Sequence, residues 1–177
     1  MSIRPSPTSA FDLAGKVCVI IGGAGLIGTD FSRRCAARGA TVVIVERDEK
    51  KGKALAKRIC EDGGKAVFEQ CDTTNQASIS ELVDRVWKHF KRVDGLVNAA
   101  HFSTGRPGKS ALNVEYGDFL DYLGKHVGGP FLASREFAKK MIKQKSGSIV
   151  FMGSIYGSIA PRFEIYAGTS QTVRAEY

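Results

Sequence analysis

Residues 17–28 read VCVIIGGAGLIG, an apolar run that passes directly into a cluster of glycines. A continuous apolar run is typical of a strand that is buried on both faces of a parallel sheet. Gly22, Gly25 and Gly28 then lie three residues apart, at the point where the strand would turn into a helix. Glycines in such a turn allow a tight bend, close approach to a pyrophosphate and close packing of helix on strand. The pattern predicts a strand–turn–helix unit that binds a dinucleotide.

The helix behind the turn strengthens this prediction. Apolar side chains recur at Ile27 and Phe31, with Cys35 next on the same face, until Gly39 ends the pattern. The first N–H groups of a helix and its positive dipole end favour phosphate. On this stretch alone, an ordinary glycine-rich turn without a ligand stays open as the alternative.

The length of 177 residues favours one domain with a sizeable core. Residues 1–12 are predicted to be a loose tail, because the first ten hold two prolines and three serines and no apolar signal region. Residues 13–177 form the predicted domain. No apolar run approaches the roughly 20 residues that a membrane span needs, so we expect no membrane partner.

The net charge of +8 has two interpretations. One is a set of solvated helix faces, and the other is a nucleic-acid surface. No basic motif with interleaved aromatic residues supports the second, so no nucleic-acid partner is predicted. The basic clusters fall within predicted helices, at residues 47–58, 85–92 and 139–145.

The four cysteines are widely spaced and form no C-x-x-C pair. Such cysteines are typical of small buried hydrophobes in a reducing compartment, and not of a disulfide framework or a metal site. We therefore predict a cytoplasmic protein without a metal. The cysteines are Cys18, Cys35, Cys60 and Cys71.

Strand patterns alternate with helix patterns along the whole chain. This order predicts an α/β fold, a Rossmann-like doubly wound parallel sheet with helices on both faces and right-handed crossovers. Pro130 should bend the long fourth helix, because proline removes a helix hydrogen bond. The predicted strands cover residues 17–21, 41–45, 65–71, 93–98 and 148–152, and the helices residues 26–38, 48–62, 78–90 and 117–144.

An acidic residue, Glu46, ends the second predicted strand. A carboxylate there can accept both ribose hydroxyls of an adenosine and repels a 2′-phosphate. A solvated charge at a strand end is the alternative interpretation. The neighbouring Arg47 could instead accommodate the phosphate of NADP, so we favour NAD and keep NADP open.

The ordered set of motifs resembles the short-chain dehydrogenase/reductase family from Leu13 onward. The set comprises the glycine turn, Glu46, the stretch Cys71-Asp72-Thr73, and residues 94–100, which read DGLVNAA. The resemblance implies that Asp72 approaches the adenine amino group and that Asn98 and the residues after it line the cofactor and brace the sheet. The implied cofactor-binding residues are Gly22, Gly25, Leu26, Ile27, Gly28, Glu46, Arg47, Asp72, Thr73, Asn98, Ala99 and Ala100.

The chain departs from the usual family pattern at four positions. Ile21 stands where threonine is common, and Leu26 replaces a glycine of the turn. Ala99 and His101 stand within the stretch that usually reads Asn-Asn-Ala-Gly. These changes leave the dinucleotide site in place and loosen the assignment to a subgroup.

The resemblance also implies a catalytic set that acts on a small alcohol or carbonyl substrate. Ser154, at the end of the fifth predicted strand, matches the serine that holds the reacting oxygen; a simple turn or helix cap is its alternative role. His126 stands at the helix position that usually carries an asparagine. It could relay protons or hold a water, or it could simply be a packed side chain.

The family's proton donor is the tyrosine of Tyr-x-x-x-Lys, whose lysine favours the phenolate of a group with a pKa near about 10. Tyr166 lies twelve residues after Ser154, but Ser170 stands at its lysine position. Residues 172–177, TVRAEY, resemble bacterial members with a longer loop after the fifth strand. We therefore predict Tyr177 as the catalytic tyrosine, with Tyr166 as the alternative.

Tyr177 is the last residue of the chain. The resemblance then implies that the chain is truncated before its lysine and lacks the last helix and strands of the usual fold. We expect hydride transfer between a nicotinamide and a secondary alcohol or ketone, with a homo-oligomer as the full-length form, and inefficient catalysis by this chain alone. The alternative is a non-catalytic dinucleotide-binding protein.

Overall fold

The computed structural model describes residues 11–102, 112–160, 162–166 and 168. Its centre is a parallel sheet with the strand order β3-β2-β1-β4-β5. Because β1 lies between β2 and β4, the chain winds outward in both directions from its first strand. The strands are β1 (Val17–Ile21), β2 (Thr41–Glu46), β3 (Lys65–Gln70), β4 (Gly95–Asn98) and β5 (Ser148–Phe151).

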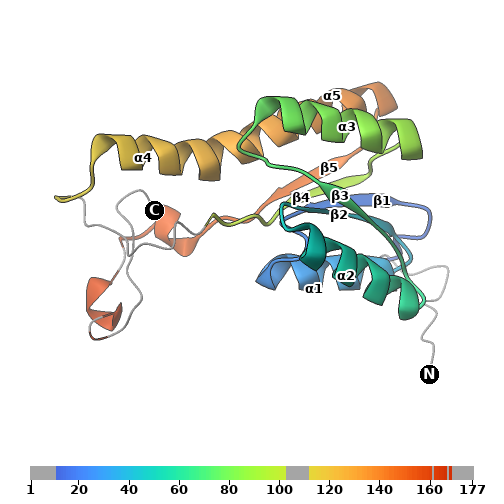
Figure 1. Cartoon of the computed structure of the whole chain (residues 1–177), viewed down its shortest axis with the longest axis horizontal. Helices are drawn as coiled ribbons and strands as arrows, with labels where there is room; N and C mark the ends of the chain where they lie inside the picture. Colours follow the sequence, from blue (N-terminus) through green and yellow to red (C-terminus); the bar gives the residue numbers. More distant parts are fainter. Residues whose placement is uncertain (1–10, 103–111, 161, 167, 169–177) are drawn as a thin grey trace.

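Helices cover both faces of the sheet (Figure 1). α1 (Leu26–Ala37) and α2 (Glu49–Glu61) lie on one face, and α3 (Gln76–Phe90) and α5 (Gly129–Gln144) lie on the other. β1 and β2 are apolar along their length because alternate side chains enter two separate cores, and Val19 packs with α3 while Ile20 packs with α2. The predicted doubly wound parallel sheet is confirmed.

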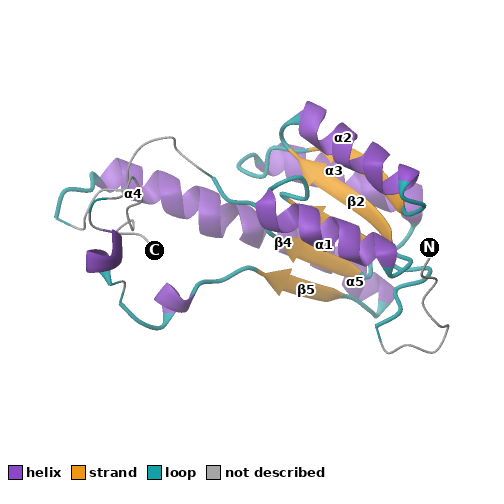
Figure 2. Cartoon of the chain, turned by 90° about the horizontal axis from the view of Figure 1, so that it is seen from below, coloured by secondary structure: helices purple, strands orange, loops and turns teal. Residues whose placement is uncertain are grey.

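The chain extends beyond the sheet at one end, where α4 (Tyr116–Leu123) projects past the strands (Figure 2). α4 continues into the π-helical turn η1 (Gly124–Gly128) and then into α5. Within η1 the N–H of Gly129 donates to the carbonyl of Gly124, five residues back. Pro130 thus enters α5 in its first turn, where its missing N–H costs little. The predicted bend is replaced by a π turn.

The predicted elements agree with the structure except at some ends. α3 begins at Gln76, two residues before its predicted start, because the Asn75 side chain accepts hydrogen bonds from the N–H groups of Ala77 and Ser78. β4 begins at Gly95, so that the two residues before it belong to no strand. β3 and β5 each end one residue earlier than predicted.

The cysteines are all free thiols, as predicted. Cys18 and Cys71 are buried, but Cys60 is exposed, so the prediction of a buried side chain is wrong there. Cys60 follows the core residue Ile59 on α2, and its thiol donates to the carbonyl of Ala66 at the start of β3, at 3.5 Å. Among the described residues no helix is long and apolar enough to cross a membrane.

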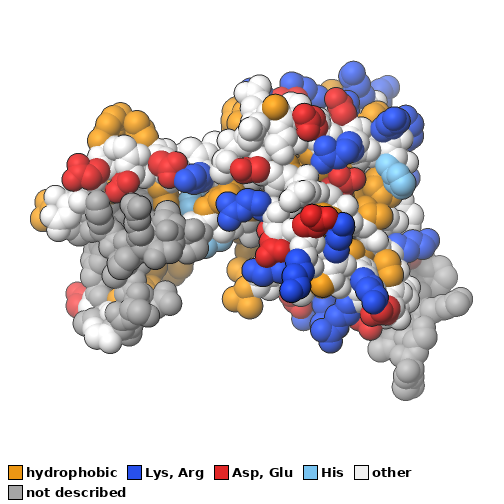
Figure 3. Space-filling model, viewed as in Figure 1, with side chains coloured by type: hydrophobic (Ala, Val, Ile, Leu, Met, Phe, Trp, Pro, Cys, Tyr) orange, Lys and Arg blue, Asp and Glu red, His pale blue; other side chains and the backbone are white. Residues whose placement is uncertain are grey.

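The basic side chains lie among acidic ones on the helix faces (Figure 3). Several are paired along one helix, such as Lys53 with Glu49 and Lys57 with Glu61. This mixing of signs is typical of solvated outer helix faces.

A half-buried carboxylate, that of Asp94, ties the starts of β1, β4 and β5 together. Asp94 accepts the N–H of Val17 at 2.9 Å and binds the Arg92 guanidinium through both oxygens, at 2.8 and 2.6 Å. Its backbone also bonds to Val17 and Ser148. Burial by itself would raise the pKa of the Asp94 carboxyl, but the hydrogen bonds from Arg92 and Val17 hold that pKa below its ordinary value.

We predict that Asp94→Asn lowers the free energy of unfolding by about 2 kcal/mol near neutral pH, because charge-assisted hydrogen bonds are lost. Because the pKa of Asp94 is lower in the folded state, its carboxylate stabilises the fold fully above the unfolded-state pKa of about 3.9. This stabilisation is lost as the pH falls through the folded-state pKa. Denaturant titrations at pH values of about 7 and about 3 should give a wild-type advantage that shrinks at the lower pH.

Asp30→Asn is the matched control. It breaks the exposed pair of Asp30 with Arg34 on α1 and should cost much less. An Asp94→Asn loss as small as the control's, or one that stays constant down to low pH, would contradict this account.

Candidate functional site

A cavity of about 450 Å³ opens at the carboxyl ends of β1, β2 and β4. This edge of a doubly wound sheet is where such folds bind ligands. We call it the turn cavity, because the glycine turn forms one wall. It is lined by the predicted cofactor-binding residues except Gly28 and Asn98, namely Gly22, Gly25, Leu26, Ile27, Glu46, Arg47, Asp72, Thr73, Ala99 and Ala100.

The glycine turn is shaped by close backbone contacts. Gly22 has a φ of +70°, and a Cβ at this residue would lie 2.6 Å from the Cα of Ala100. A Cβ on Gly28 would lie 2.0 Å from the carbonyl oxygen of Gly22. Gly28 is thus a packing residue that draws α1 onto the turn, and it does not line the cavity.

The start of α1 suits a phosphate. Gly25 is the N-cap residue and supplies no side-chain hydrogen bond, so the first helical N–H groups are left without a side-chain cap. Leu26, which replaces the family's glycine, is 95% exposed and does not fill the turn. The substitution therefore leaves the turn cavity open.

The two residues that bear on cofactor choice both lie in the wall of the turn cavity. Glu46 Oε1 accepts the N–H of Arg47 at 2.9 Å, which holds the carboxylate at the end of β2. The Arg47 side chain is exposed. One wall of the turn cavity thus carries an anion with a cation beside it.

Asp72 follows β3 and is held by a local turn. Its Oδ1 accepts the N–H of Thr74 at 2.9 Å and the hydroxyl of Thr74 at 2.7 Å. These hydrogen bonds, helped by the charges of Arg47 and Lys125, hold the pKa of the Asp72 carboxyl below its ordinary value. The next residue, Thr73, is buried, and its carbonyl abuts Gly129 at the start of α5.

Asn98 ties β4 to α5. Its Nδ2 donates to the hydroxyl of Ser134 at 3.0 Å, and the residue is buried. Its Oδ1 is buried with no hydrogen-bond partner in the described part of the chain. This arrangement matches the bracing role expected for Asn98.

A second cavity, of about 380 Å³, adjoins the first and contains Ser154; we call it the serine cavity. Ile27, Ala99, Ala100 and His101 line both cavities. Ser154 Oγ accepts the N–H of Tyr156 at 3.2 Å and so caps the short helix η2 (Ile155–Gly157). Because the hydroxyl acts as an acceptor in this bond, its proton remains a donor.

His126 lies in η1 and also lines the serine cavity. Its Nε2 accepts the N–H of Phe102 at 3.2 Å, so its Nδ1 is the nitrogen that donates to the carbonyl of Tyr122, also at 3.2 Å. The ring stacks on Tyr122 with 3.8 Å between centroids. The backbone thus occupies both ring nitrogens, an arrangement that suits a packing role.

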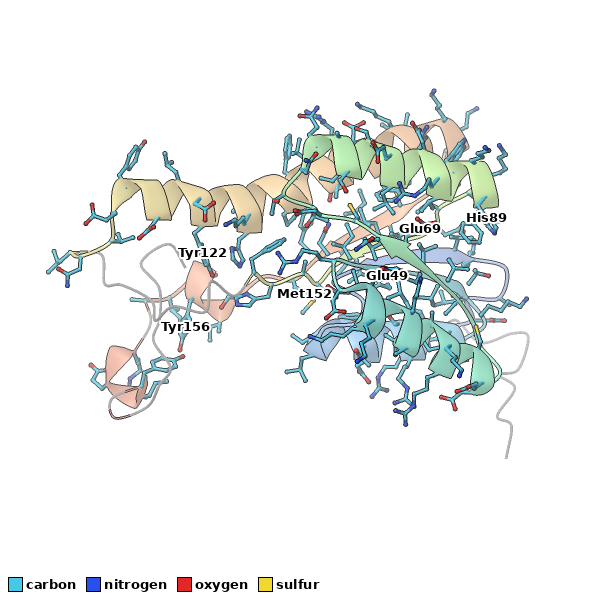
Figure 4. The ribbon with its side chains drawn as sticks, in the orientation of Figure 1. Glu49, Glu69, His89, Tyr122, Met152 and Tyr156 are labelled. Carbon is cyan, nitrogen blue, oxygen red and sulfur yellow. The ribbon has the colours of Figure 1, made fainter. Side chains whose placement is uncertain are left out.

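The two candidate tyrosines are placed differently. Tyr177 lies outside the described residues. Tyr166, in η3 (Phe163–Tyr166), shares a 2.8 Å hydroxyl–hydroxyl hydrogen bond with Tyr156, which Figure 4 labels. Neither Tyr156 nor Tyr166 lines either cavity.

Sequence reasoning missed several lining residues. Phe102 directly follows the predicted stretch at residues 98–101, so extending that stretch by one residue would have included it. Tyr122 and Met152 line the serine cavity from α4 and from the end of β5 (Figure 4). Tyr122 lies one helical turn before His126 and thus on the same helix face, so the sequence position of His126 could have pointed to it.

Comparison with known proteins gives consistent matches. The family model described as short chain dehydrogenase matches residues 16–175. Tropinone reductase-like 2 from Erythroxylum coca is 34% identical over 149 residues, which are 84% of this chain and 53% of that protein. Cyclopentanol dehydrogenase from Comamonas testosteroni is 32% identical over 160 residues, 90% of this chain and 63% of that protein.

A solved structure gives the same result for the fold. A metagenomic short-chain oxidoreductase in complex with NADP superposes with a TM-score of 0.75 at 30% identity, over 82% of this chain and 65% of that one. In these three comparisons the chain thus spans between about half and two thirds of the other protein's length.

We predict that Gly28→Ala lowers the free energy of unfolding by about 2 kcal/mol, because the added methyl overlaps the Gly22 carbonyl and outweighs the better helix propensity of alanine. Gly25→Ala is the matched control, since its Cβ would meet only the Gly22 carbonyl at 3.1 Å. It should cost about 1 kcal/mol or less. Urea titrations of both variants make the comparison, and equal losses would refute the packing role of Gly28.

Proposed function

The chain belongs to the short-chain dehydrogenase family, and from that premise we propose that it is an oxidoreductase that binds a nicotinamide dinucleotide in the turn cavity. The substrate is a secondary alcohol or ketone, held in the serine cavity. The names of the relatives, a reductase and an alcohol dehydrogenase, support this reaction class. We favour NAD over NADP because of Glu46.

The observation that carries the proposal is the junction of the two cavities. Their shared wall contains Ile27, Ala99 and Ala100, whose small or aliphatic side chains leave the two spaces adjacent. A long ligand in the turn cavity can therefore reach a small molecule beside Ser154. Both volumes lie in the range of ligand pockets, about 300–1,000 Å³.

Each part of the site then has a chemical role. The start of α1 binds phosphate, and Glu46 accepts hydrogen bonds from a ribose. Ser154 donates a hydrogen bond to the reacting oxygen of the substrate and lowers the cost of charge on that oxygen. The bound nicotinamide supplies or accepts the hydride. Tyr177 is the proposed proton donor, with Tyr166 as the alternative.

The proposal is tested by titrating the chain with NADH and following the change in NADH fluorescence, and by assaying NAD-dependent oxidation of cyclopentanol. Saturable binding together with turnover would support the whole proposal. Binding without turnover would support the dinucleotide site and favour a non-catalytic binding protein. Absence of NADH and NADPH binding would refute both.

We also propose that the protein is a homo-oligomer. The support is an apolar face on α4, η1 and α5, where Leu120, Val127 and Phe131 are 48%, 61% and 58% exposed. Apolar side chains at this helical spacing form one stripe, and exposed stripes are typical of contact surfaces.

We predict that Val127→Ser with Phe131→Ser shifts the protein toward the monomer, because each change removes apolar area from the proposed contact. Sedimentation velocity at several concentrations measures the shift. Ile142→Ser is the control, since Ile142 is 74% exposed near the other end of α5. A wild type that stays monomeric, or a double variant that associates as the wild type does, would argue against this surface.

For the cofactor we predict that Glu46→Gln shifts the ratio of NADPH to NADH affinity about tenfold toward NADPH, because it removes the charge that repels a 2′-phosphate. Glutamine keeps an oxygen to accept the Arg47 N–H, so the end of β2 should stay folded. Fluorescence titrations with both cofactors give the ratio.

Glu49→Gln is the charge-matched control, because Glu49 lies on α2 and pairs with Lys53 outside the cavity (Figure 4). It should leave the ratio unchanged. An unchanged ratio in Glu46→Gln would remove Glu46 from cofactor selection.

A further inference from the structure

The wall shared by the two cavities carries one polar side chain, His101. This side chain is exposed. Among the described residues the imidazole makes no hydrogen bond, and its ring lies edge-on to the ring of His126, with 5.0 Å between centroids. Its ring nitrogens can therefore bond to a molecule at the junction.

The position of His101 is set by its neighbours. Phe102, the next residue, donates its N–H to His126, which anchors this segment to η1. The rings of Phe102 and Tyr122 also contact the His126 ring. Because the backbone occupies both nitrogens of His126, His101 is the imidazole of this cluster that can bind a ligand.

The serine cavity has an unusual charge composition. Its described lining residues include no Asp, Glu, Lys or Arg. The donors among its described lining residues include the imidazole of His101 and the hydroxyls of Ser154 and Tyr122. An imidazole can also hold a proton near neutral pH, and the net charge of +8 attracts anions. Such a cavity favours an acceptor oxygen, and a carboxylate above a neutral group.

We propose that His101 is a specificity residue that binds a carboxylate of the substrate. The substrate is then a short hydroxy acid, or the matching keto acid, whose reacting oxygen lies at Ser154. This inference rests on the proposed function, since it names the substrate class of the same site. The family's glycine at this position offers no side chain for such a contact.

The test compares 3-hydroxybutyrate with its uncharged amide, 3-hydroxybutanamide, by calorimetric titration with and without NADH. Wild type should bind the acid about tenfold more tightly than the amide, because a charge-assisted hydrogen bond is made only with the acid. His101→Ala should bring the two affinities to within about twofold of each other. His101→Gln, which keeps a hydrogen-bond donor, should give an acid-to-amide affinity ratio between those of the wild type and His101→Ala.

His89→Ala is the matched control, because His89 is exposed on α3 and contacts Phe90 far from both cavities in Figure 4. It should keep the wild-type ratio. Histidine side-chain NMR signals provide a second measurement, in which the acid should shift the signal that is missing in His101→Ala. Circular dichroism checks that each variant is folded.

An acid-to-amide ratio that is equal in wild type and His101→Ala, or an acid that does not bind to wild type, overturns the inference. These outcomes do not depend on the cofactor, because the titration is also made without NADH. Loss of NADH binding refutes the proposed function instead. An acid-to-amide affinity ratio that falls in His101→Ala when NADH is absent would still support the carboxylate contact.

Discussion

The approach of two backbone segments at the sheet edge controls the rest of the site. Gly22 lies so close to Ala100 that no side chain fits between the end of β1 and the segment after β4. Gly28 then brings α1 against the carbonyl of Gly22. Together these contacts place a helix N-terminus beside two strand ends. The turn cavity is the space that remains, and its shape depends on the absence of two methyl groups.

A similar constraint acts on the opposite wall. A Cβ on Gly129 would lie 2.6 Å from the carbonyl oxygen of Thr73, so glycine lets the start of α5 reach the segment after β3. The π turn η1 comes directly before this contact and places His126 against Phe102. A π turn within a helix often marks a functional site. Here it carries His126, which lines the serine cavity and accepts a hydrogen bond from the backbone of Phe102 in the wall of the turn cavity.

The sequence was sufficient for the sheet and for most of the turn cavity, because both depend on local patterns. Apolar runs identify β1 and β2, and the glycine spacing identifies the turn between β1 and α1. The errors arise where a hydrogen bond overrides a side-chain pattern. Asn75 extends α3 by capping it, and the shifted bond at Gly124 replaces the bend expected at Pro130. Cys60 was misjudged because composition does not give the direction of a side chain.

The two histidines show why the remainder of the site needs three dimensions. Alignment of motifs drew attention to His126, which occupies a position associated with catalysis. The fold brings it to Phe102 across 24 residues of sequence, and the backbone takes both of its ring nitrogens. Its neighbour His101 carries the same chemistry without those bonds. The hydrogen-bonded imidazole of His126 stabilises the cavity wall, whereas the imidazole of His101, which has no such bonds, can select a ligand. The two histidines therefore differ in their hydrogen-bond partners and not in their residue type.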